Sequence, residues 1–296
     1  RRAFCFKIKE SEKMDFCFKI SGFSDEIDSD INKQFEHLNK LGIKYFEVRG
    51  VNGKNISKLT DSEIESLKNA MDAHGISVSS IGSPIGKVKM SDDLDAHFIK
   101  FKRVVEIAKK LNSKYIRIFS FYAPDGENIE NYRGKIIENL KKMAEYAEKE
   151  GVILLHENEK DIYGDTPERC KDLFDNIKSD AFKGVFDPAN FVQCGCTTYP
   201  NAWNLLKEHI VYMHIKDAKT ENGDVVPAGY GDGNVEKIIG ELKKNGYNGF
   251  LSLEPHLGTF LGLEALETDG KMMSLEKSGP EKFTIAYDAL MKIINK

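Results

Sequence analysis

The chain of 296 residues is 41% apolar and 30% charged, which is the composition of a globular protein with one large domain or two ordinary ones. Its formal net charge of -4 provides no general attraction to nucleic acid or to an anionic membrane. No apolar stretch approaches the ~20 residues that a membrane-spanning helix needs. We therefore expect a cytoplasmic protein without nucleic-acid or membrane partners. The five cysteines are odd in number and lack CxxC spacing, which predicts reduced thiols.

The N-terminal stretch contains a short repeat. The sequence FCFKI occurs at 4–8 and again at 16–20, with Met14 between the two copies. We interpret residues 1–13 as an extension that is not native to the domain, with a hairpin that closes one end of the fold as the alternative. The second copy leads into residues 21–26 and is expected to form the first strand. The domain is therefore predicted to span 14–296.

Predicted strands and helices alternate from there to the end of the chain. Short apolar runs between turn residues indicate strands, and amphipathic stretches with capping residues indicate helices. Thr60 and Glu63 have the spacing of a capping box, and Gly75 ends the same helix. The predicted strands are 16–20, 43–48, 76–81, 115–119, 152–155, 184–186, 210–213 and 250–253; the predicted helices are 30–41, 60–75, 95–111, 128–150, one that begins at 166, 235–245 and 280–294.

Eight strands that alternate with helices, without a low-complexity linker, predict a single (β/α)8 TIM barrel. The main alternative is a doubly wound open sheet, but the chain lacks a GxGxxG turn after its first strand. The active site of a TIM barrel forms at the carboxyl ends of its strands. The residues that follow the predicted strands are therefore the first candidates for chemistry.

The last four predicted strands each end in a side chain that can bind a cation, namely Glu157, Asp187, His214 and Glu254. Since these strands are neighbours in a barrel and lie about one strand–helix unit apart, the four side chains are expected to converge on one ion. Three carboxylates and one imidazole favour Mn²⁺ or Mg²⁺, with Co²⁺ or Zn²⁺ as alternatives. One such residue alone would indicate only a surface charge, a helix cap or a core histidine. The prediction depends on all four.

The segments around these residues resemble the four signatures of the sugar phosphate isomerase/epimerase superfamily, the xylose-isomerase-like barrels. They are HENE at 156–159, DPANF at 187–191, HIKD at 214–217 and LEPH at 253–256, and GYGDG at 229–233 is similar to the glycine-rich segment of that family. The resemblance covers nearly everything from Met14 onward. It implies one divalent metal bound by the four residues above, and a small-molecule sugar or sugar phosphate as substrate.

Two departures from the family pattern concern the neighbours of the metal. Many members carry histidine where this chain has Glu159 and Asn190, so we expect different contacts there. The related DNA-repair endonucleases use additional histidines to hold three metals, and this chain has too few at the matching places. One metal is therefore expected.

The ligand set and the resemblance together predict proton transfer. Removal of a proton next to a sugar carbonyl forms an enediolate, whose negative charge a divalent ion stabilises as a Lewis acid. The resemblance implies that Glu157 and Glu254 are the acid–base pair of an isomerase or epimerase. A single base acting on one face would yield an aldose–ketose isomer, and the sequence leaves this choice open. The alternatives are an inosose dehydratase on the same site and a barrel that binds sugar without turnover.

Five other side chains are candidates for substrate binding. Lys216 and His256 each follow a predicted ligand by two positions, so each leaves its strand on the same side as that ligand. Glu47 and Arg49 end the second strand with the parity that faces the barrel interior, with an internal ion pair as the alternative. Lys87 lies after the third strand in a loop that contains two glycines.

Three further residues are expected to have supporting roles. His156 precedes Glu157 and should point to the opposite side of the strand, which suggests a structural role. Asp217 and Arg117 are candidates for contacts behind the ligands. The sequence leaves the oligomeric state open, with a homodimer as one option.

Overall fold

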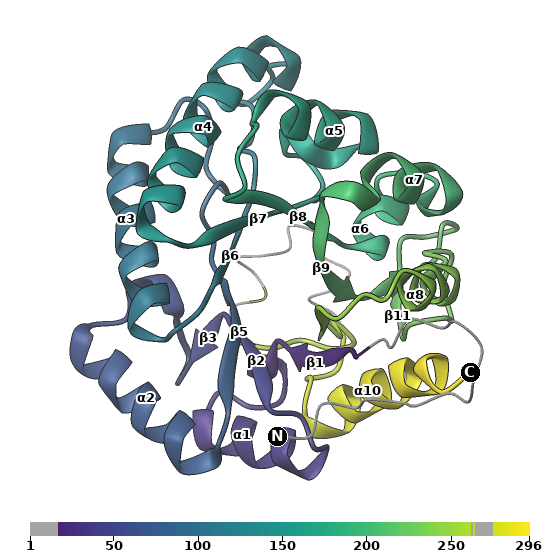
Figure 1. Cartoon of the computed structure of the whole chain (residues 1–296). Helices are drawn as coiled ribbons and strands as arrows, with labels where there is room; N and C mark the ends of the chain where they lie inside the picture. The colour runs from purple at the N-terminus through teal and green to yellow at the C-terminus, as the bar shows by residue number, and fades with distance from the viewer. Residues whose placement is uncertain (1–16, 262, 264–274) are drawn as a thin grey trace.

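The computed structural model describes residues 17–261, 263 and 275–296, and the predicted extension at 1–13 lies outside them. Eight parallel strands form a ring that is enclosed by helices (Figure 1). In chain order they are β1 (Lys19–Gly22), β2 (Tyr45–Val48), β5 (Ser77–Gly82), β6 (Tyr115–Ile118), β7 (Ile153–Glu157), β8 (Phe182–Phe186), β9 (Ile210–Ile215) and β12 (Phe250–Leu253). The predicted single (β/α)8 TIM barrel is confirmed.

The ring closes between its first and second strands. The hydrogen-bonded order of the strands is β1-β12-β9-β8-β7-β6-β5-β2. Strands that are consecutive in the chain therefore pair with each other, except β1 and β2, and the last strand, β12, pairs with the first. β1 and β2 lie in contact at the remaining gap. This arrangement places β7, β8, β9 and β12 side by side, as the convergence of their terminal residues requires.

The helices that cover the ring follow the sequence signals closely. They are α1 (Ile31–Lys40), α2 (Asp61–His74), α3 (Leu94–Lys110), α4 (Arg133–Glu150), α5 (Pro167–Asn176), α8 (Val235–Lys244) and α10 (Pro280–Ile294). The capping box of Thr60 and Glu63 is present, and Gly75 ends α2 in the left-handed conformation with φ 62°. The helix predicted at 128–150 begins instead with a separate 3-10 turn, η3 (Ile129–Tyr132). None of the helices in the described part of the chain has the length and apolar character needed to cross a bilayer.

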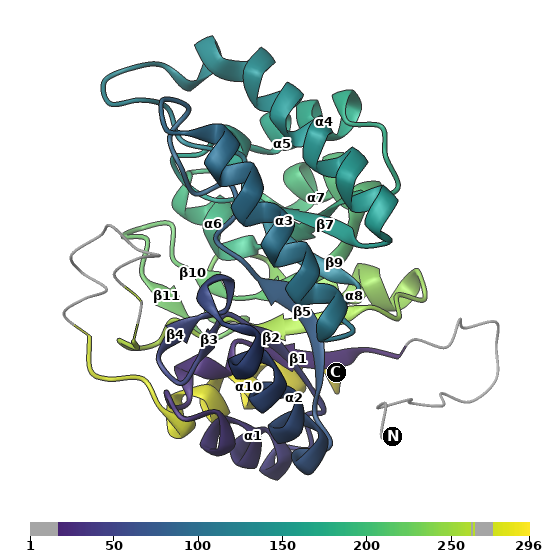
Figure 2. The same cartoon turned by 90° about the vertical axis from the view of Figure 1, so that its left-hand side faces the viewer.

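Several short elements were not predicted from the sequence. Two hairpins, β3 with β4 and β10 with β11, lie on the same side of the barrel (Figure 2). A pair of short helices, α6 and α7, stands between β8 and β9. The bounds are β3 (Gly50–Val51), β4 (Lys54–Asn55), β10 (Asp217–Ala218), β11 (Val225–Val226), α6 (Pro188–Gln193) and α7 (Trp203–Leu206), with turns η1 (Ser24–Glu26), η2 (Ile56–Lys58), η4 (Tyr163–Asp165), η5 (Thr198–Ala202) and η6 (Lys207–His209).

Candidate metal centre

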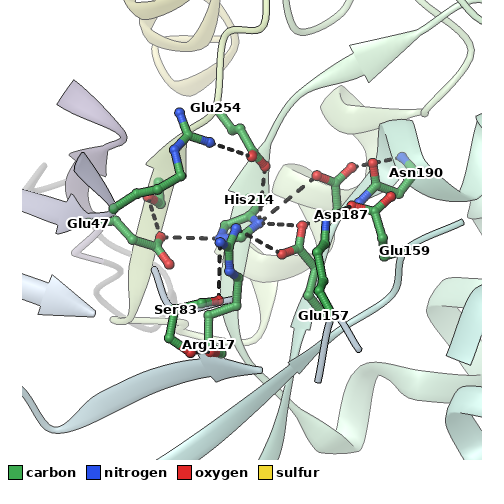
Figure 3. A network of polar contacts seen from close by, with 12 residues as sticks. Glu47, Ser83, Arg117, Glu157, Glu159, Asp187, Asn190, His214 and Glu254 are labelled. Carbon is green, nitrogen blue, oxygen red and sulfur yellow. Dashed lines mark hydrogen bonds and ion pairs between the residues drawn. The ribbon is translucent and has the colours of Figure 1, made fainter. Parts of the chain in front are cut away.

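Four acidic and imidazole side chains meet at the carboxyl ends of β7, β8, β9 and β12. Glu157, Asp187, His214 and Glu254 are all buried, and one ligand atom of each lies within 4.8 Å of the others (Figure 3). His214 Nδ1 is 3.0 Å from Glu157 Oε1, 3.4 Å from Glu254 Oε2 and 4.0 Å from Asp187 Oδ2. The structure thus brings together the four residues that the sequence pattern selected, and the cluster could hold a metal ion.

Asp187 shows how the local sequence prepares one ligand. Its Oδ1 accepts the backbone N–H of Asn190 at 2.9 Å and caps α6, which begins at Pro188. Its Oδ2 is buried and accepts no regular hydrogen bond from the described residues, although Lys216 Nζ lies 3.1 Å away. A buried carboxylate oxygen needs a donor or a cation, so this atom, with only an ammonium group beside it, fits the role of a metal ligand.

The two glutamates of the cluster have matching surroundings. Glu157 Oε2 lies 3.2 Å from Arg117 Nη1, and Glu254 Oε1 lies 3.3 Å from Arg49 Nη1. Both guanidinium groups also stack on the ring of Phe23, at 5.1 Å for Arg117 and 4.4 Å for Arg49. Each glutamate therefore turns one oxygen toward His214 Nδ1 and the other toward an arginine.

The arginine beside Glu254 belongs to a larger buried network. Arg49 forms a two-point ion pair with Asp25, at 2.9 Å from both Nε and Nη2, and its Nη2 lies 3.2 Å from Glu26 Oε1. His256 Nε2 lies 3.3 Å from Glu254 Oε1, and its backbone N–H donates to Glu26 Oε2 at 2.8 Å. The internal ion pair considered for Arg49 is therefore present.

A cavity of about 420 Å³ adjoins this network. It is lined by Asp25 and Glu26 from η1, which follows β1, and by Thr259 and Phe260 from the segment after β12. Glu26 contacts both this cavity and Arg49, whereas none of the four clustered residues lines the cavity.

Two lysines complete the polar wall of the site. Lys216 Nζ lies 3.1 Å from Asp187 Oδ2 and 3.4 Å from Glu254 Oε2, and Lys87 Nζ lies 3.0 Å from Glu159 Oε2. Burial alone would lower the pKa of Lys216, but the carboxylates around it raise that pKa well above its ordinary value. Both side chains are therefore held next to the cluster by carboxylates.

Electrostatics within the cluster shift the pKa values of Asp187 and Glu254 in opposite directions. Burial, reinforced by Glu254 and Glu157 against the pull of Lys216, raises the pKa of Asp187 to about 7. Burial would also raise the pKa of Glu254, but Lys216, His256 and His214 outweigh it and hold that pKa well below its usual range. Asp187 thus takes up a proton more readily than Glu254.

Two sequence candidates lie away from the metal-facing side of the cluster. Glu47 Oε2 lies 3.1 Å from His214 Nε2, behind the imidazole as seen from the other ligands. His156 points outward, where it is buried against Phe174 and Phe182, and burial lowers its pKa to about 3. His156 is a neutral core residue.

The glycine-rich segment at 229–233 binds the carboxylate of Asp217. The carboxylate of this residue accepts the backbone N–H groups of Gly229, Gly231 and Gly233 at 2.8–3.1 Å, and that of Ala218 at 2.9 Å. A Cβ at Gly231 or Gly233 would lie within 2.6 Å of Asp217 Oδ1, so the close approach requires glycine there. Asp217 fixes this loop and makes no contact with the four clustered residues.

Sequence reasoning did not select Phe23, Asp25, Glu26 or Asn158. Asn158 holds the backbone of Asp187 by two hydrogen bonds of 2.9 Å. Asp25 and Glu26 follow the first strand, so the strand-end argument used for the later strands would have found them. Phe23 gave no such signal, because an aromatic residue after a strand is more often part of the core.

Comparisons with known proteins agree with this fold. A family model described as xylose isomerase-like TIM barrel matches residues 35–272. No curated protein is a significant match. Among solved structures, the IolI protein with a bound zinc atom has a TM-score of 0.74 at 17% identity, covering 94% of this chain and 98% of that one.

Two other solved structures are similar to the same extent. A D-tagatose 3-epimerase-like protein has a TM-score of 0.71 at 17% identity over 94% of this chain and 97% of that one. A probable 3-DHS dehydratase from Bacillus anthracis has a TM-score of 0.71 at 15% identity over 93% and 99%. At sequence identities of 15–17%, these similarities show a common fold and no more.

Proposed function

Because the chain belongs to the xylose isomerase-like TIM barrel family, we propose that it is a divalent-metal-dependent isomerase or epimerase of a sugar or a related polyol ketone. The observation that carries this proposal is the convergence of Glu157, Asp187, His214 and Glu254 within 4.8 Å. A divalent ion held there, with Mn²⁺ or Mg²⁺ favoured by the oxygen-rich donor set, would act as a Lewis acid toward the charge that develops beside a carbonyl.

We assign removal and return of the substrate proton to Glu157 and Glu254. Glu157 comes from β7 and Glu254 from β12, on either side of the strand that carries His214. The arginine beside each glutamate pairs with one carboxylate oxygen and fixes the orientation of the group, so that the other oxygen faces the cluster, which suits a base. Removal by one glutamate and return by the other would invert the carbon and give an epimer. Removal and return on one face would give an aldose–ketose isomer.

The surrounding ion pairs support an uncharged substrate. Lys87 is paired with Glu159, and Lys216 with Asp187, so a phosphate would have to compete with buried carboxylates for each lysine. The backbone N–H groups of the loop between β9 and β12, a common phosphate site in TIM barrels, donate to Asp217. Paired donors and acceptors of this kind suit sugar hydroxyl groups, and we assign Lys87, Lys216 and His256 to them.

The proposal is tested by NMR in D₂O with the Mg²⁺-loaded protein and a panel of ketoses, aldoses, their phosphates and inosose. We expect exchange of one carbon-bound hydrogen in an unphosphorylated ketone, together with an epimer or isomer as product. Loss of water from inosose would identify the dehydratase instead. Binding of a sugar without exchange in any compound would leave a sugar-binding barrel and contradict the proposal.

A further inference from the structure

The imidazole of His214 lies between the carboxylates of the cluster and the carboxylate of Glu47 (Figure 3). Its Nδ1 faces the cluster, at 3.0 Å from Glu157 Oε1 and 3.4 Å from Glu254 Oε2. Its Nε2 faces Glu47 on the other side, at 3.1 Å from Oε2. The ring is fully buried, and the edge-to-face ring of Phe23, at 5.3 Å between centroids, limits its rotation.

An irregularity in the pairing of β2 with β5 directs the side chain of Glu47 toward His214. β2 pairs with β5 in regular register up to Phe46 and Val78, and the register then shifts so that Glu47 lies opposite Ser80. An irregularity of this kind re-aims the side chain that follows it, and such bulges are frequent beside active sites. Glu47 is 1% exposed, and its Oε2 also accepts the hydroxyl of Ser252 at 2.8 Å.

An imidazole binds a metal through one nitrogen while the other carries hydrogen. An ionised carboxylate can only accept hydrogen bonds, so Glu47 requires a hydrogen on Nε2. In the other tautomer the hydrogen is on Nδ1 and points at Glu157 Oε1, so the nitrogen that faces the cluster is not available to a metal. The contact with Glu47 therefore selects which nitrogen is available to a metal.

We propose that Glu47 is a positioning residue, which holds His214 in the tautomer and ring orientation that present Nδ1 to the metal. This gives Glu47 a place behind a ligand instead of the substrate contact expected from its strand parity. The inference rests on the proposed metal centre. It concerns metal affinity, so it can be tested without knowledge of the substrate.

The main test compares the Mn²⁺ affinity of the wild-type protein with that of Glu47→Leu and Glu47→Gln. Leucine is of similar size and cannot accept the hydrogen bond, whereas the amide oxygen of glutamine can. Loss of a partner behind a metal-binding histidine typically costs about 10–100-fold in metal affinity. We expect a loss of this size in Glu47→Leu and a smaller loss in Glu47→Gln, measured by titration and the EPR signal of free Mn²⁺.

Ser80→Ala is the matched control, because Ser80 is the buried neighbour of Glu47 on β5 and its hydroxyl has no hydrogen-bond partner among the residues that the structure describes. This variant should bind Mn²⁺ as the wild type does. Circular dichroism and the melting temperature report whether each variant is folded. A folded Glu47→Leu protein with wild-type Mn²⁺ affinity would overturn the inference, whereas a wild-type protein that binds no divalent ion would overturn the metal centre itself.

A second measurement needs no variant that removes Glu47, which matters if leucine prevents folding. Imidazole ¹⁵N shifts of the Zn²⁺-loaded wild-type protein identify the protonated nitrogen of each histidine, and His214 is assigned by its absence in His214→Ala. We expect hydrogen on Nε2 and a metal-bound Nδ1. Hydrogen on Nδ1 of His214 would contradict the proposal.

Discussion

Arg117 Nη1 lies 3.2 Å from Glu157 Oε2, the carboxylate oxygen that does not face His214 Nδ1. Arg49 has the same relationship to Glu254 Oε1, at 3.3 Å. In each pair the arginine neutralises the glutamate from behind and leaves the other oxygen directed at the cluster. The two glutamates are thus prepared in the same way, although Glu157 lies on β7, two strands from β9, and Glu254 follows β12, the neighbour of β9 on the other side.

The first prediction follows from this pairing. Glutamine at position 157 or 254 keeps one coordinating oxygen but cannot accept a proton. General acid–base catalysis typically contributes about 10²–10⁴-fold, so Glu157→Gln and Glu254→Gln should each lose at least ~10²-fold in kcat under saturating Mg²⁺. Glu63→Gln, in the capping box of α2, is a matched control that should keep full turnover.

Binding and exchange separate the roles of the two glutamates. If they act on opposite faces, each variant should still bind substrate in a calorimetric titration, and one should retain exchange of a single hydrogen without turnover. Near-normal turnover in either variant would remove that glutamate from the mechanism and make Lys216 or His256 the next candidate.

The second prediction concerns the metal. Asp187→Ala and His214→Ala should each lose tight binding of one divalent ion per chain, as measured by elemental analysis of purified protein. Asp187→Ala also removes the cap of α6, at a cost of about 0.5–2 kcal/mol in stability. Asp187→Asn keeps an oxygen that can accept the N–H of Asn190, so it should lose metal while retaining the stability of the helix. Stoichiometric metal in a folded Asp187→Ala/His214→Ala double variant would show that the site lies elsewhere.

The third prediction concerns Lys87, which we assign to a substrate hydroxyl. Lys87→Met together with Glu159→Gln removes both charges of the pair and leaves no buried charge unpaired. Loss of a hydrogen bond from a charged group costs about 1.5–3 kcal/mol, so KM should rise by roughly tenfold or more with little change in kcat. Steady-state kinetics check this, and an unchanged KM would place the substrate away from the Lys87 loop.

The fourth prediction concerns pH and the same loop. Burial, together with Lys100, lowers the pKa of His97 to about 4, and the neutral ring accepts the backbone N–H of Gly86 at 2.9 Å. In the unfolded chain this histidine has its ordinary pKa of about 6.5. The contribution of His97 to stability is therefore complete above pH ~6.5 and is lost as the pH falls toward 4, because only the unfolded chain takes up the proton.

Urea unfolding at several pH values measures this effect. We expect the free energy of unfolding of the wild-type protein to fall more steeply between pH 6.5 and 4 than that of His97→Gln, which has no titrating ring. Parallel pH profiles for the two proteins would show that folding does not lower the pKa of His97.

The sequence predicted the barrel and the meeting of the four strand-end side chains well because both depend on local patterns. Each apolar run ends next to the residue that matters, and helix ends such as Thr60 and Gly75 are set by neighbours in the chain. Strand parity also predicted that Glu47 and Arg49 face the interior. Parity does not predict how far into the barrel a side chain lies, however. The register shift between Phe46 and Glu47 also could not be predicted, because it arises from the pairing of β2 with β5.

Two other residues have a second role that their local pattern does not show. Asp187 is at once the candidate ligand and the cap of α6, a helix too short to show amphipathic periodicity. Asp217 takes up the N–H groups of the glycine-rich loop, which the sequence alone would equally well assign to a phosphate. The cap of α6 is a local contact, but the meeting of Asp187 with the other three clustered residues, and that of Asp217 with the loop at 229–233, arise only from the packing of the barrel.

The most direct test of the account is an activation titration. Protein freed of metal by a chelator is titrated with Mg²⁺, and the rate at which the substrate exchanges hydrogen with D₂O is followed by NMR. We predict no exchange in the metal-free protein and a rate that rises until one ion per chain is bound, with no such rise in Asp187→Asn. Full exchange by the metal-free protein, or equal activation of Asp187→Asn, would contradict the metal-dependent proton transfer proposed for Glu157 and Glu254.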